Sequence, residues 1–311
     1  MQTGNWTLIS EFILLGLTED PLLQLLLFVF FLLIYIATLV GNVGIMTLIS
    51  VTPQLHTPMY FLLWNLSFID ISGTSVIVPI MLNNFLSKKK SISFPGCATQ
   101  MFLIFTIGST EVFMLPVMAY DRYVAICNPL LYRVIMNNRV CVHFIGFIYS
   151  VAILNALIQT TLTFMQPFCE SNKISHFFCD IPPMLKLSCS DTTINEAVLI
   201  LVAGVLIILS FVIVLISYLY IVLTILKIRS SVGRTKAFST CSSHFICVTL
   251  LYFTLIFMYA KPVSRTSTIK DRVVSVFYTL IIPMLNPLIY SLRNQEVKQA
   301  FRRATRKKET V

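Results

Sequence analysis

Two acidic side chains stand within long apolar stretches of the chain, where a charge is costly to bury. Asp70 lies inside the run Met59–Leu86, and Glu111 lies inside the run Cys97–Ala125. A charged side chain at the centre of a bilayer costs about 2.5–3.5 kcal/mol or more, so each acid needs a partner or a function. The two carboxylates either hold a cation or share a hydrogen-bonded network between helices, with one carboxyl protonated. They form the candidate metal site, with a structural sodium ion as the only cofactor expected.

A charged triplet, Asp121-Arg122-Tyr123, lies at the end of the run Cys97–Ala125. In one interpretation Arg122 simply anchors the helix at the membrane interface. In the other, Asp121 holds the Arg122 guanidinium and releases it when helices move, which exposes a donor to a partner protein.

A proline motif near the end of the chain predicts a hinge. Pro283, Asn286, Pro287 and Tyr290 spell P-x-x-N-P-x-x-Y inside the apolar run Val273–Leu292. Pro287 removes the hydrogen bond to the carbonyl of Pro283, and we expect Asn286 to satisfy the freed backbone groups.

Four of the eight cysteines, Cys97, Cys169, Cys179 and Cys189, fall at or between the ends of apolar runs on one side of the chain. Four cysteines allow three disulfide connectivities. A link from Cys97 to the long loop before Thr193 would close that end of a helix bundle. A zinc or copper site that uses His176 with Cys179 and Cys169 is the alternative, which an oxidising compartment disfavours.

The composition requires an integral membrane protein. Of the 311 residues, 57% are hydrophobic and 12% are charged, and the mean hydropathy is +0.84. A soluble domain has about 45–50% apolar and about 25% charged residues, and a disordered chain has fewer apolar residues still. The net charge of +10 therefore concerns the two sides of a membrane rather than nucleic acid.

Seven apolar runs are long enough to span a bilayer, which takes about 20 residues. They are Leu22–Ile49, Met59–Leu86, Cys97–Ala125, Val140–Met165, Thr193–Leu226, Ala237–Ala260 and Val273–Leu292. The runs are too long for barrel strands and show no alternation of period two. The predicted fold class is therefore an all-α membrane protein, a bundle of seven transmembrane helices.

The distribution of basic residues orients the bundle. Fourteen of the 23 Lys and Arg residues lie in the loops and tail that include Arg122 and Arg302, which gives that side a net charge of +11 and leaves +1 on the other. Basic loops stay in the cytoplasm, so we expect the N-terminus outside and the C-terminus inside a plasma membrane. Asn5-Trp6-Thr7 is a glycosylation sequon in the outer tail, and no cleaved signal peptide is visible.

The segment after the last span predicts a short amphipathic helix. Val297, Ala300, Phe301 and Ala304 recur at helical spacing among basic residues, which favours a helix lying on the inner leaflet over a solvated charge run. We divide the chain into an extracellular tail (1–21), the bundle (22–292) and a cytoplasmic helix and tail (293–311).

Together these features resemble a rhodopsin-like G-protein-coupled receptor, and five local strings resemble the olfactory (odorant) receptors of the tetrapod, airborne-odorant class. The strings are Leu55–Tyr60 (LHTPMY), Met118–Cys127 (MAYDRYVAIC), Ser217-Tyr218, Lys236–His244 (KAFSTCSSH) and Pro283–Asn294 (PMLNPLIYSLRN). The resemblance covers nearly the whole chain.

The resemblance implies roles for these residues. A small volatile ligand would bind between spans three, five, six and seven, and the olfactory stimulatory G protein would raise cyclic AMP. The disulfides would be Cys97–Cys179 and Cys169–Cys189, and Asp70 with Glu111 would form the cation site. The residues of coupling and activation would be Asp121, Arg122, Tyr123, Tyr218, Lys236, Asn286, Pro287 and Tyr290.

The chain departs from the family pattern at three places. Leu251-Tyr252-Phe253 replaces the usual Phe-Tyr-Gly, Leu63 stands where Phe is usual, and Pro116 interrupts span three six residues before Arg122. Pro116 would cost the hydrogen bond to the carbonyl of Val112.

A ligand pocket is expected between spans three, five, six and seven. Its candidate residues are Met101, Ile104, Phe105, Gly108, Ser109 and Val112 on span three, Val202 and Leu206 on span five, Tyr252, Leu255, Ile256 and Tyr259 on span six, and Thr279 on span seven. Stripes of this kind also pack helices together, so we expect about half of them only to form the bundle core. Receptors for biogenic amines carry Asp where Ile104 stands, so a neutral, mostly apolar ligand is predicted here.

Two other classes of membrane protein would also place acidic residues within the bilayer. A transporter or channel would use Asp70 and Glu111 to carry ions or protons, but inverted repeats are missing from the sequence. An intramembrane protease would use the same two acids as a catalytic pair, but no second catalytic motif accompanies them.

Overall fold

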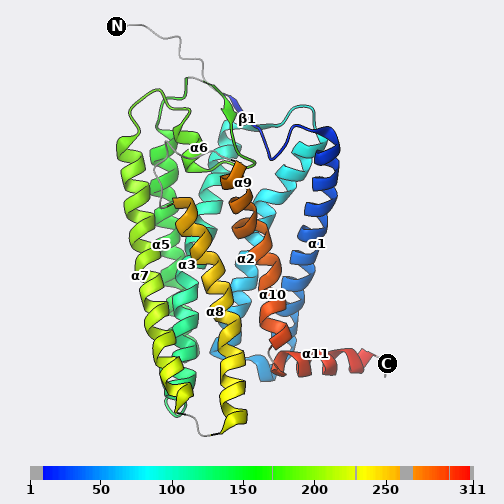
Figure 1. Ribbon diagram of the computed structural model, residues 1–311, viewed down its shortest axis with the longest axis vertical. Coiled ribbons are helices and arrows are strands. Elements are labelled where there is room, and N and C mark those ends of the chain that lie inside the picture. The colour runs from blue at the N-terminus through cyan, green and yellow to red at the C-terminus, as the bar shows by residue number, and fades with distance from the viewer. Residues whose placement is uncertain (1–9, 170, 228–229, 260–268, 294, 309–311) are drawn as a thin grey trace.

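The computed structural model describes residues 10–169, 171–227, 230–259, 269–293 and 295–308, and these form a bundle of long helices (Figure 1). The helices of the bundle are α1 (Pro21–Val51), α2 (Pro58–Leu86), α3 (Phe94–Cys127), α5 (Asn138–Phe164), α7 (Thr193–Leu226), α8 (Ser231–Tyr259), α9 (Ile269–Val276) and α10 (Ile282–Arg293). The π-helix η3 (Phe277–Ile281) joins α9 to α10, and α11 (Gln295–Lys308) follows. The short elements are β1 (Glu11–Leu14), β2 (Ser91–Ser93), β3 (Lys173–Ile174), the 3-10 helix η1 (Pro53–Leu55), α4 (Tyr132–Ile135) and α6 (Ile181–Leu185).

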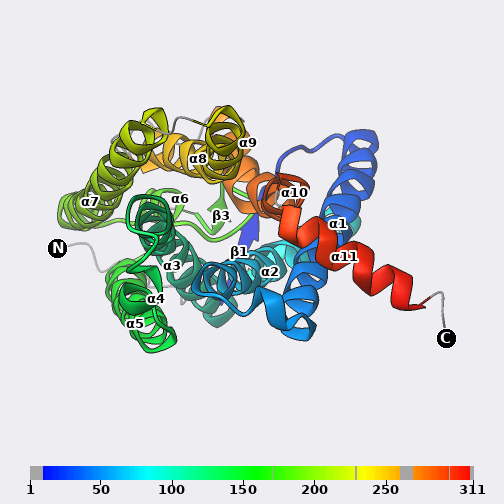
Figure 2. The same cartoon turned by 90° about the horizontal axis from the view of Figure 1, so that it is seen from below.

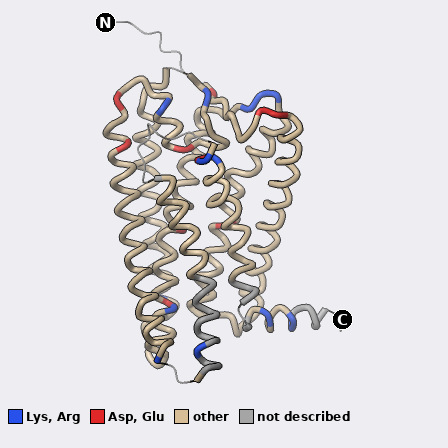
Figure 3. Tube along the Cα trace, viewed as in Figure 1, with Lys and Arg blue, Asp and Glu red and all other residues tan. Residues whose placement is uncertain are grey.

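Six helical segments of the described chain are long and apolar enough to cross a membrane, namely α1, α2, α3, α5, α7 and Ile269–Ile289. The apolar part of α8, Phe245–Met258, is a shorter helix of the same character. Large apolar side chains such as Leu33 and Phe147 lie exposed on the outside of the bundle, where lipid rather than water would cover them. Charged positions gather at the two ends of the bundle and are sparse between them (Figure 3). The predicted bundle of seven helices is confirmed.

Side-chain caps explain where several helices begin. Asp20 Oδ1 accepts a hydrogen bond of 3.0 Å from the Leu23 N–H, and Pro21 occupies the first turn of α1. The hydroxyl of Ser93 accepts from the Gly96 N–H at 3.2 Å, so α3 begins at Phe94 rather than at the predicted Cys97. A cap satisfies one of the backbone donors that an α-helix leaves free at its N-terminus.

A small sheet closes the end of the bundle from which the chain starts. The strand order is β2-β1-β3, with β1 antiparallel to β2 and parallel to β3. Phe12 and Leu14 of β1 are fully buried beneath it. We call the sheet and the segment from Cys169 to Cys189 the lid. The sequence analysis did not predict the sheet, because its strands have only two to four residues.

The seventh span is not a single α-helix. It passes from α9 through the π-helix η3 into α10, which contains Pro287. Single π turns inside α-helices are rare and occur often at functional sites. Beyond α10, α11 turns across the end of the bundle opposite the lid (Figures 1 and 2). The predicted helix is present, and it buries Val297 and Ala300 of the predicted apolar stripe, whereas Phe301 of the same stripe is exposed.

Helix α1 approaches α10 closely at Gly41. A Cβ atom at this position would lie 2.9 Å from Cγ of Pro287, so any larger residue forces the two helices apart. The next residue of α1, Asn42, donates through its amide to the carbonyl of Pro283 at 3.1 Å. This is the carbonyl that Pro287 leaves without its helical donor. Asn42 of α1 therefore satisfies the freed backbone group that we expected Asn286 to satisfy.

Candidate functional site

A cavity of about 100 Å³ lies inside the bundle, between α3, α5, α7, α8 and η3. Its lining residues are Ile104, Phe105, Gly108, Ser109, Glu111, Val112, Phe113, Asn155, Ala203, Leu206, Ile207, Leu251, Leu255 and Tyr278. Most of these side chains are apolar. The amide of Asn155 donates to the hydroxyl of Ser109 at 3.0 Å, which leaves the Ser109 proton available to another acceptor. We call this cavity the interior pocket.

Seven residues predicted to bind ligand line the interior pocket. They are Ile104, Phe105, Gly108, Ser109, Val112, Leu206 and Leu255. They come from three helices that are distant in sequence, so the packing of the bundle brings them together. Glu111, predicted as half of a metal site, lies in the same wall.

The remaining predicted ligand residues lie elsewhere. Met101 is fully buried beneath the lid, and Tyr252 packs against Phe211 with ring centroids 5.4 Å apart. Ile256 is 45% exposed on the outside of the bundle, because it follows Leu255 by one residue and so points about 100° away around the helix. The Thr279 hydroxyl donates to the carbonyl of Ser275 within its own span. Val202 is half-buried outside the pocket lining.

Further residues line the interior pocket that were not predicted, because the sequence does not show how each helix is rotated about its axis. Asn155 on α5 contributes the amide that meets Ser109, and Tyr278 enters from the π turn. Phe113, Ala203, Ile207 and Leu251 complete the missed set. The polar Asn155 within an apolar span was the one available signal, because a buried amide needs a partner.

Disulfides tie the lid to the bundle. Cys97 at the start of α3 is bonded to Cys179, and Cys169 is bonded to Cys189, with Cα atoms 5.6 and 5.8 Å apart respectively. With all four sulfurs paired in this way, none is free to ligate a metal. No cluster of three His, Cys, Asp or Glu residues suited to a metal occurs in the described chain.

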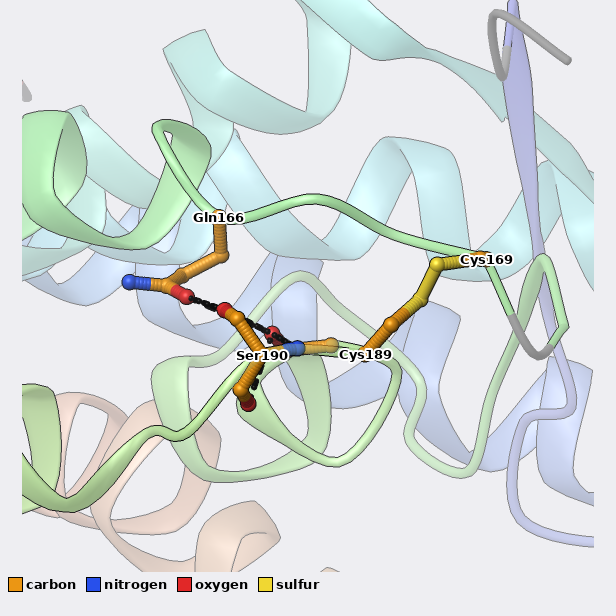
Figure 4. Close-up of a disulfide and its surroundings, with 5 residues drawn as sticks. Gln166, Cys169, Cys189 and Ser190 are labelled. Atoms are coloured by element: carbon orange, nitrogen blue, oxygen red, sulfur yellow. Dashed lines mark hydrogen bonds between the residues drawn. A yellow bond between two sulfur atoms is a disulfide. The ribbon is translucent and has the colours of Figure 1, made fainter. Parts of the chain in front are cut away.

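Hydrogen bonds beside the second disulfide join the end of α5 to the start of α7. The side-chain oxygen of Gln166 accepts from the hydroxyl of Ser190 (Figure 4). It also accepts from the hydroxyl of Ser188. The Gln166 amide donates to Asn195 at 2.9 Å, and the Asn195 amide donates to the carbonyl of Leu162 at 2.8 Å. These bonds therefore fix the end of α5, the lid and the start of α7 relative to one another.

Polar contacts also fix the lid to α9. The Arg272 guanidinium donates to the carbonyl of Gly16 at 2.7 Å, and His176 Nε2 lies 3.1 Å from the hydroxyl of Ser275. Burial, with the nearby Arg272 charge, lowers the pKa of His176 to about 3, so this imidazole is neutral at physiological pH. The lid therefore contacts the seventh span through the neutral His176 imidazole, and the turn after β1 contacts it through the Gly16 carbonyl that accepts from Arg272.

Asp180 is a buried acid in the lid. Its side chain is 1% exposed, and Oδ1 accepts from the Ile181 N–H at 2.9 Å. Oδ2 has no hydrogen-bond partner among the described residues. Burial raises the pKa of Asp180 to about 7, against the lowering effect of that hydrogen bond.

The two interior acids lie close enough to interact. Asp70 and Glu111 are both buried and share an electrostatic interaction. The amide of Asn286 donates to both Asp70 oxygens, at 3.2 and 3.0 Å, while its own oxygen has no partner among the described residues. Two carboxyls and an unpartnered amide oxygen form a set of hard oxygen ligands, which suits a small cation.

The end of α3 that carries Arg122 differs, within the described residues, from the interpretation in which Asp121 holds the Arg122 guanidinium. Asp121 is 1% exposed and accepts a hydrogen bond of 2.8 Å from the hydroxyl of Tyr132 on α4. No ion pair joins Asp121 to Arg122 within the described chain. The described residues form an ion pair elsewhere, between Lys89 and Glu11. Successive helix residues do not face one another. Arg122 is half-buried and free of that expected bridge.

Aromatic residues surround this end of α3. Tyr123 packs near Tyr220 of α7, with ring centroids 5.8 Å apart, and Tyr218 packs edge-on against Phe245 of α8 at 5.3 Å. Predicted sites at Asn5 and at the side chains of Lys236, Tyr259 and Tyr290 lie outside the residues that the structure describes.

Comparison with known proteins places the chain in a family. The family model described as olfactory receptor matches residues 31–308. The chain is 54% identical to olfactory receptor 5AP2 of Mus musculus, over 97% of this chain and 96% of that protein. It is 50% identical to olfactory receptor 5G3 of Homo sapiens, over 100% and 99%, and 51% identical to the olfactory receptor-like protein OLF1 of Canis lupus familiaris, over 98% of each. The chain, a multi-pass helix bundle matched over nearly its whole length at this identity, belongs to the olfactory receptor family.

Proposed function

We propose that this chain binds a small, neutral, mostly apolar volatile molecule in the interior pocket and activates the olfactory stimulatory G protein, which raises cyclic AMP. The observation that carries the proposal is the lining of the pocket, which is mainly apolar, with Ser109, Glu111, Asn155 and Tyr278 as its polar groups. Burial of apolar surface yields about 25 cal/mol per Å², so a small ligand reaches micromolar affinity without a charge pair.

Because the interior pocket is small, ligand binding requires helices of the bundle to move. Its volume of about 100 Å³ lies well below the roughly 300–1,000 Å³ of most ligand sites. A ligand larger than a few water molecules must therefore displace α3, α7 or α8 on binding. A ligand that binds the wider arrangement more tightly shifts the population toward it.

Membership of the family makes the chain a receptor and not an enzyme, so the intramembrane protease hypothesis is wrong. The acids Asp70 and Glu111 are instead proposed to hold a sodium ion with the Asn286 oxygen. Sodium should then raise the melting temperature of the wild-type receptor and leave that of Asp70→Asn unchanged. An equal effect of sodium on both proteins would contradict the site.

The proposed orientation puts the lid outside the cell and α11 on the cytoplasmic face. The excess of basic residues at the α11 end supports it, and so does the position of the half-buried Arg122 at that end of α3. In this orientation Asp121, Arg122, Tyr123 and Tyr218 face the G protein.

The proposal is tested in cells that express the chain with the olfactory stimulatory G protein. A dose–response panel of neutral volatiles, carboxylic acids and amines should raise cyclic AMP for neutral members. A response to charged amines alone would refute the neutral ligand and point to Glu111 as an anionic partner. Arg122→Ala should abolish the response with surface expression unchanged, and a full response in that variant would remove Arg122 from coupling.

A further inference from the structure

The described residues between the interior pocket and the lid are tightly packed. Ile104 and Phe105, the pocket residues of α3 that lie closest to the lid, pack against apolar clusters that contain Phe178 and Cys179. Phe178 and Cys179 are fully buried, and Cys179 is bonded to Cys97 of α3. None of the described lid residues lines the pocket. A ligand arriving through these residues would have to unpack the lid.

The walls of the pocket differ in how well they are covered. On the side of α8, the lining residues Val112, Leu251 and Leu255 are all buried. On the side of α5 and α7, the lining residues Asn155 and Leu206 are only half-buried. The pocket is therefore less well covered toward α5 and α7 than toward α8.

Helices α5 and α7 both pack against α3 and touch one another at few places. Figure 2 shows α3 set between them. One of their contacts lies near the lid, where the Asn195 amide of α7 donates to the carbonyl of Leu162 of α5 at 2.8 Å. This bond identifies the faces that the two helices turn toward one another.

The same two faces continue toward the middle of the membrane. Val202 lies seven residues after Asn195 on α7, and Asn155 lies seven residues before Leu162 on α5, so each is two turns along its face and about 10 Å deeper. Val202 is half-buried outside the pocket lining, whereas Leu206, one turn further along, lines the pocket. We call the region between Asn155, Val202 and Leu206 the lateral opening.

Lipid surrounds the lateral opening. Leu154, beside Asn155, is 59% exposed, and Leu201, beside Val202, is 65% exposed. Both residues lie in helices long and apolar enough to span the membrane. A neutral apolar volatile concentrates in the hydrocarbon of a bilayer, because transfer of apolar surface out of water is favourable. The ligand supply is therefore greatest on this side of the pocket.

We propose that the ligand enters and leaves the interior pocket from the bilayer, through the lateral opening, and not through the lid. This inference rests on the proposed function of the interior pocket. Val202 lies at the outer edge of the opening, and the hydrogen-bonded pair of Asn155 and Ser109 is the polar group that the ligand meets inside it. A larger side chain at Val202 slows entry and exit alike, so it leaves the equilibrium affinity unchanged.

The test places a thiol in the pocket and measures how fast two reagents reach it in the full-length receptor in phosphatidylcholine nanodiscs. Gly108→Cys supplies the thiol, because nothing lies within 4 Å of a Cβ atom added at Gly108. Methyl methanethiosulfonate is neutral and enters lipid, whereas its trimethylammonioethyl analogue is cationic and stays in water. Peptide mass spectrometry separates the introduced thiol from the native cysteines. The neutral reagent should label this thiol, and the cationic reagent should not.

Val202→Trp in the Gly108→Cys background tests the route. The indole covers the lateral opening and should slow labelling by the neutral reagent about tenfold, because it must move aside before the reagent passes. Leu201→Trp is the matched control, since this neighbour on α7 points about 100° away around the helix. It should leave the rate unchanged. Equal labelling rates for the two variants would overturn the proposal.

A second pair of variants on α5 does not depend on the folding of Val202→Trp. Ile158 lies one turn beyond Asn155 and is 45% exposed, and its neighbour Leu157 is 50% exposed on the far side of the helix. Ile158→Trp should slow labelling and Leu157→Trp should not. Labelling by the cationic reagent as fast as by the neutral one would assign entry to the lid. The labelling needs neither an odorant nor a G protein, so its failure is distinct from failure of the cyclic AMP panel.

Discussion

At the scale of single residues, the buried Asp121 depends on Tyr132 rather than on its neighbour Arg122. Burial and the adjacent Asp121 carboxylate raise the pKa of Tyr132, so its hydroxyl stays protonated and donates to Asp121 at all physiological pH values. This contact joins α3 to the short helix α4. The geometry of the coupling end is therefore set by a neutral donor outside α3.

We expect Tyr132→Phe to destabilise the receptor by about 1–3 kcal/mol, because it leaves a buried carboxylate without its donor. Melting with a thiol-reactive dye measures this, since Cys141 and Cys247 are buried and take no part in the disulfides. Tyr149→Phe is the control, because the Tyr149 hydroxyl makes no hydrogen bond to the described residues. Equal melting temperatures for both variants would show that the Tyr132–Asp121 bond contributes nothing.

Asp180 makes the stability of the lid depend on pH. Its pKa is about 7 in the fold, against an ordinary value of 3.8, so the folded protein favours the neutral carboxyl. The stability that this provides is complete below pH 4 and is lost as pH rises through about 7, with a slope of at most about 1.4 kcal/mol per pH unit. Asp180→Asn removes this dependence.

The measurement compares melting temperatures of wild type and Asp180→Asn from pH 5 to pH 8. The wild-type value should fall relative to the variant as pH rises. The pKa of His176 falls from 6.5 to about 3 on folding, so His176 makes both proteins more stable as pH rises from 5 to about 6.5. This effect is common to wild type and Asp180→Asn and cancels in the comparison. Parallel curves for the two proteins would show that Asp180 is not buried as described.

At the scale of elements, the contact of α1 with α10 depends on a glycine. Gly41→Ala would bring a Cβ atom to 2.9 Å from Pro287, and overpacking of this kind costs about 1–3 kcal/mol. The shift would also weaken the bond from Asn42 to the Pro283 carbonyl. Gly44→Ala is the matched control on the same helix, because nothing lies within 4 Å of its added Cβ.

Thermal melting and cyclic AMP output of the two alanine variants test this contact. Gly41→Ala should melt earlier than wild type, and Gly44→Ala should not. If Gly41→Ala retains wild-type stability, α10 bends at Pro287 at no cost in stability, and its contact with α1 does not fix its position.

The helix boundaries show how far the sequence predicts elements. The span Thr193–Leu226 coincides with α7, because hydropathy alone defines a helix whose sides mostly face lipid. The seventh span was predicted as one helix, but the structure contains a π turn at Phe277–Ile281. One extra residue per turn leaves the hydropathy pattern almost unchanged, so composition does not reveal it.

At the scale of the whole molecule, the two disulfides hold the lid over loops of different length. Cys97 and Cys179 are 82 residues apart, and Cys169 and Cys189 are 20 apart. In the chain-entropy description, the longer loop contributes about 1.2 kcal/mol more to stability. Removing Cys97–Cys179 by paired serine substitutions should therefore lower the melting temperature more than removing Cys169–Cys189.

Surface expression and dye melting of the two paired variants measure this difference. The opposite order would mean that the hydrogen bonds around Gln166, rather than loop length, determine the contribution of each bridge. Single-cysteine variants are avoided because each would leave an unpaired thiol.

The residue pattern alone predicts the membrane class, the number of spans and the polar positions that need partners. Hydropathy is additive along the chain, and a buried carboxylate such as Asp70 costs energy in any arrangement of helices. The partners of these groups are visible only in the folded bundle. Asn42 rather than Asn286 meets the Pro283 carbonyl, Tyr132 rather than Arg122 meets Asp121, and Asn155 enters the pocket. Such pairings depend on how each helix is rotated about its axis, and rotation is set by the packing of all the helices together.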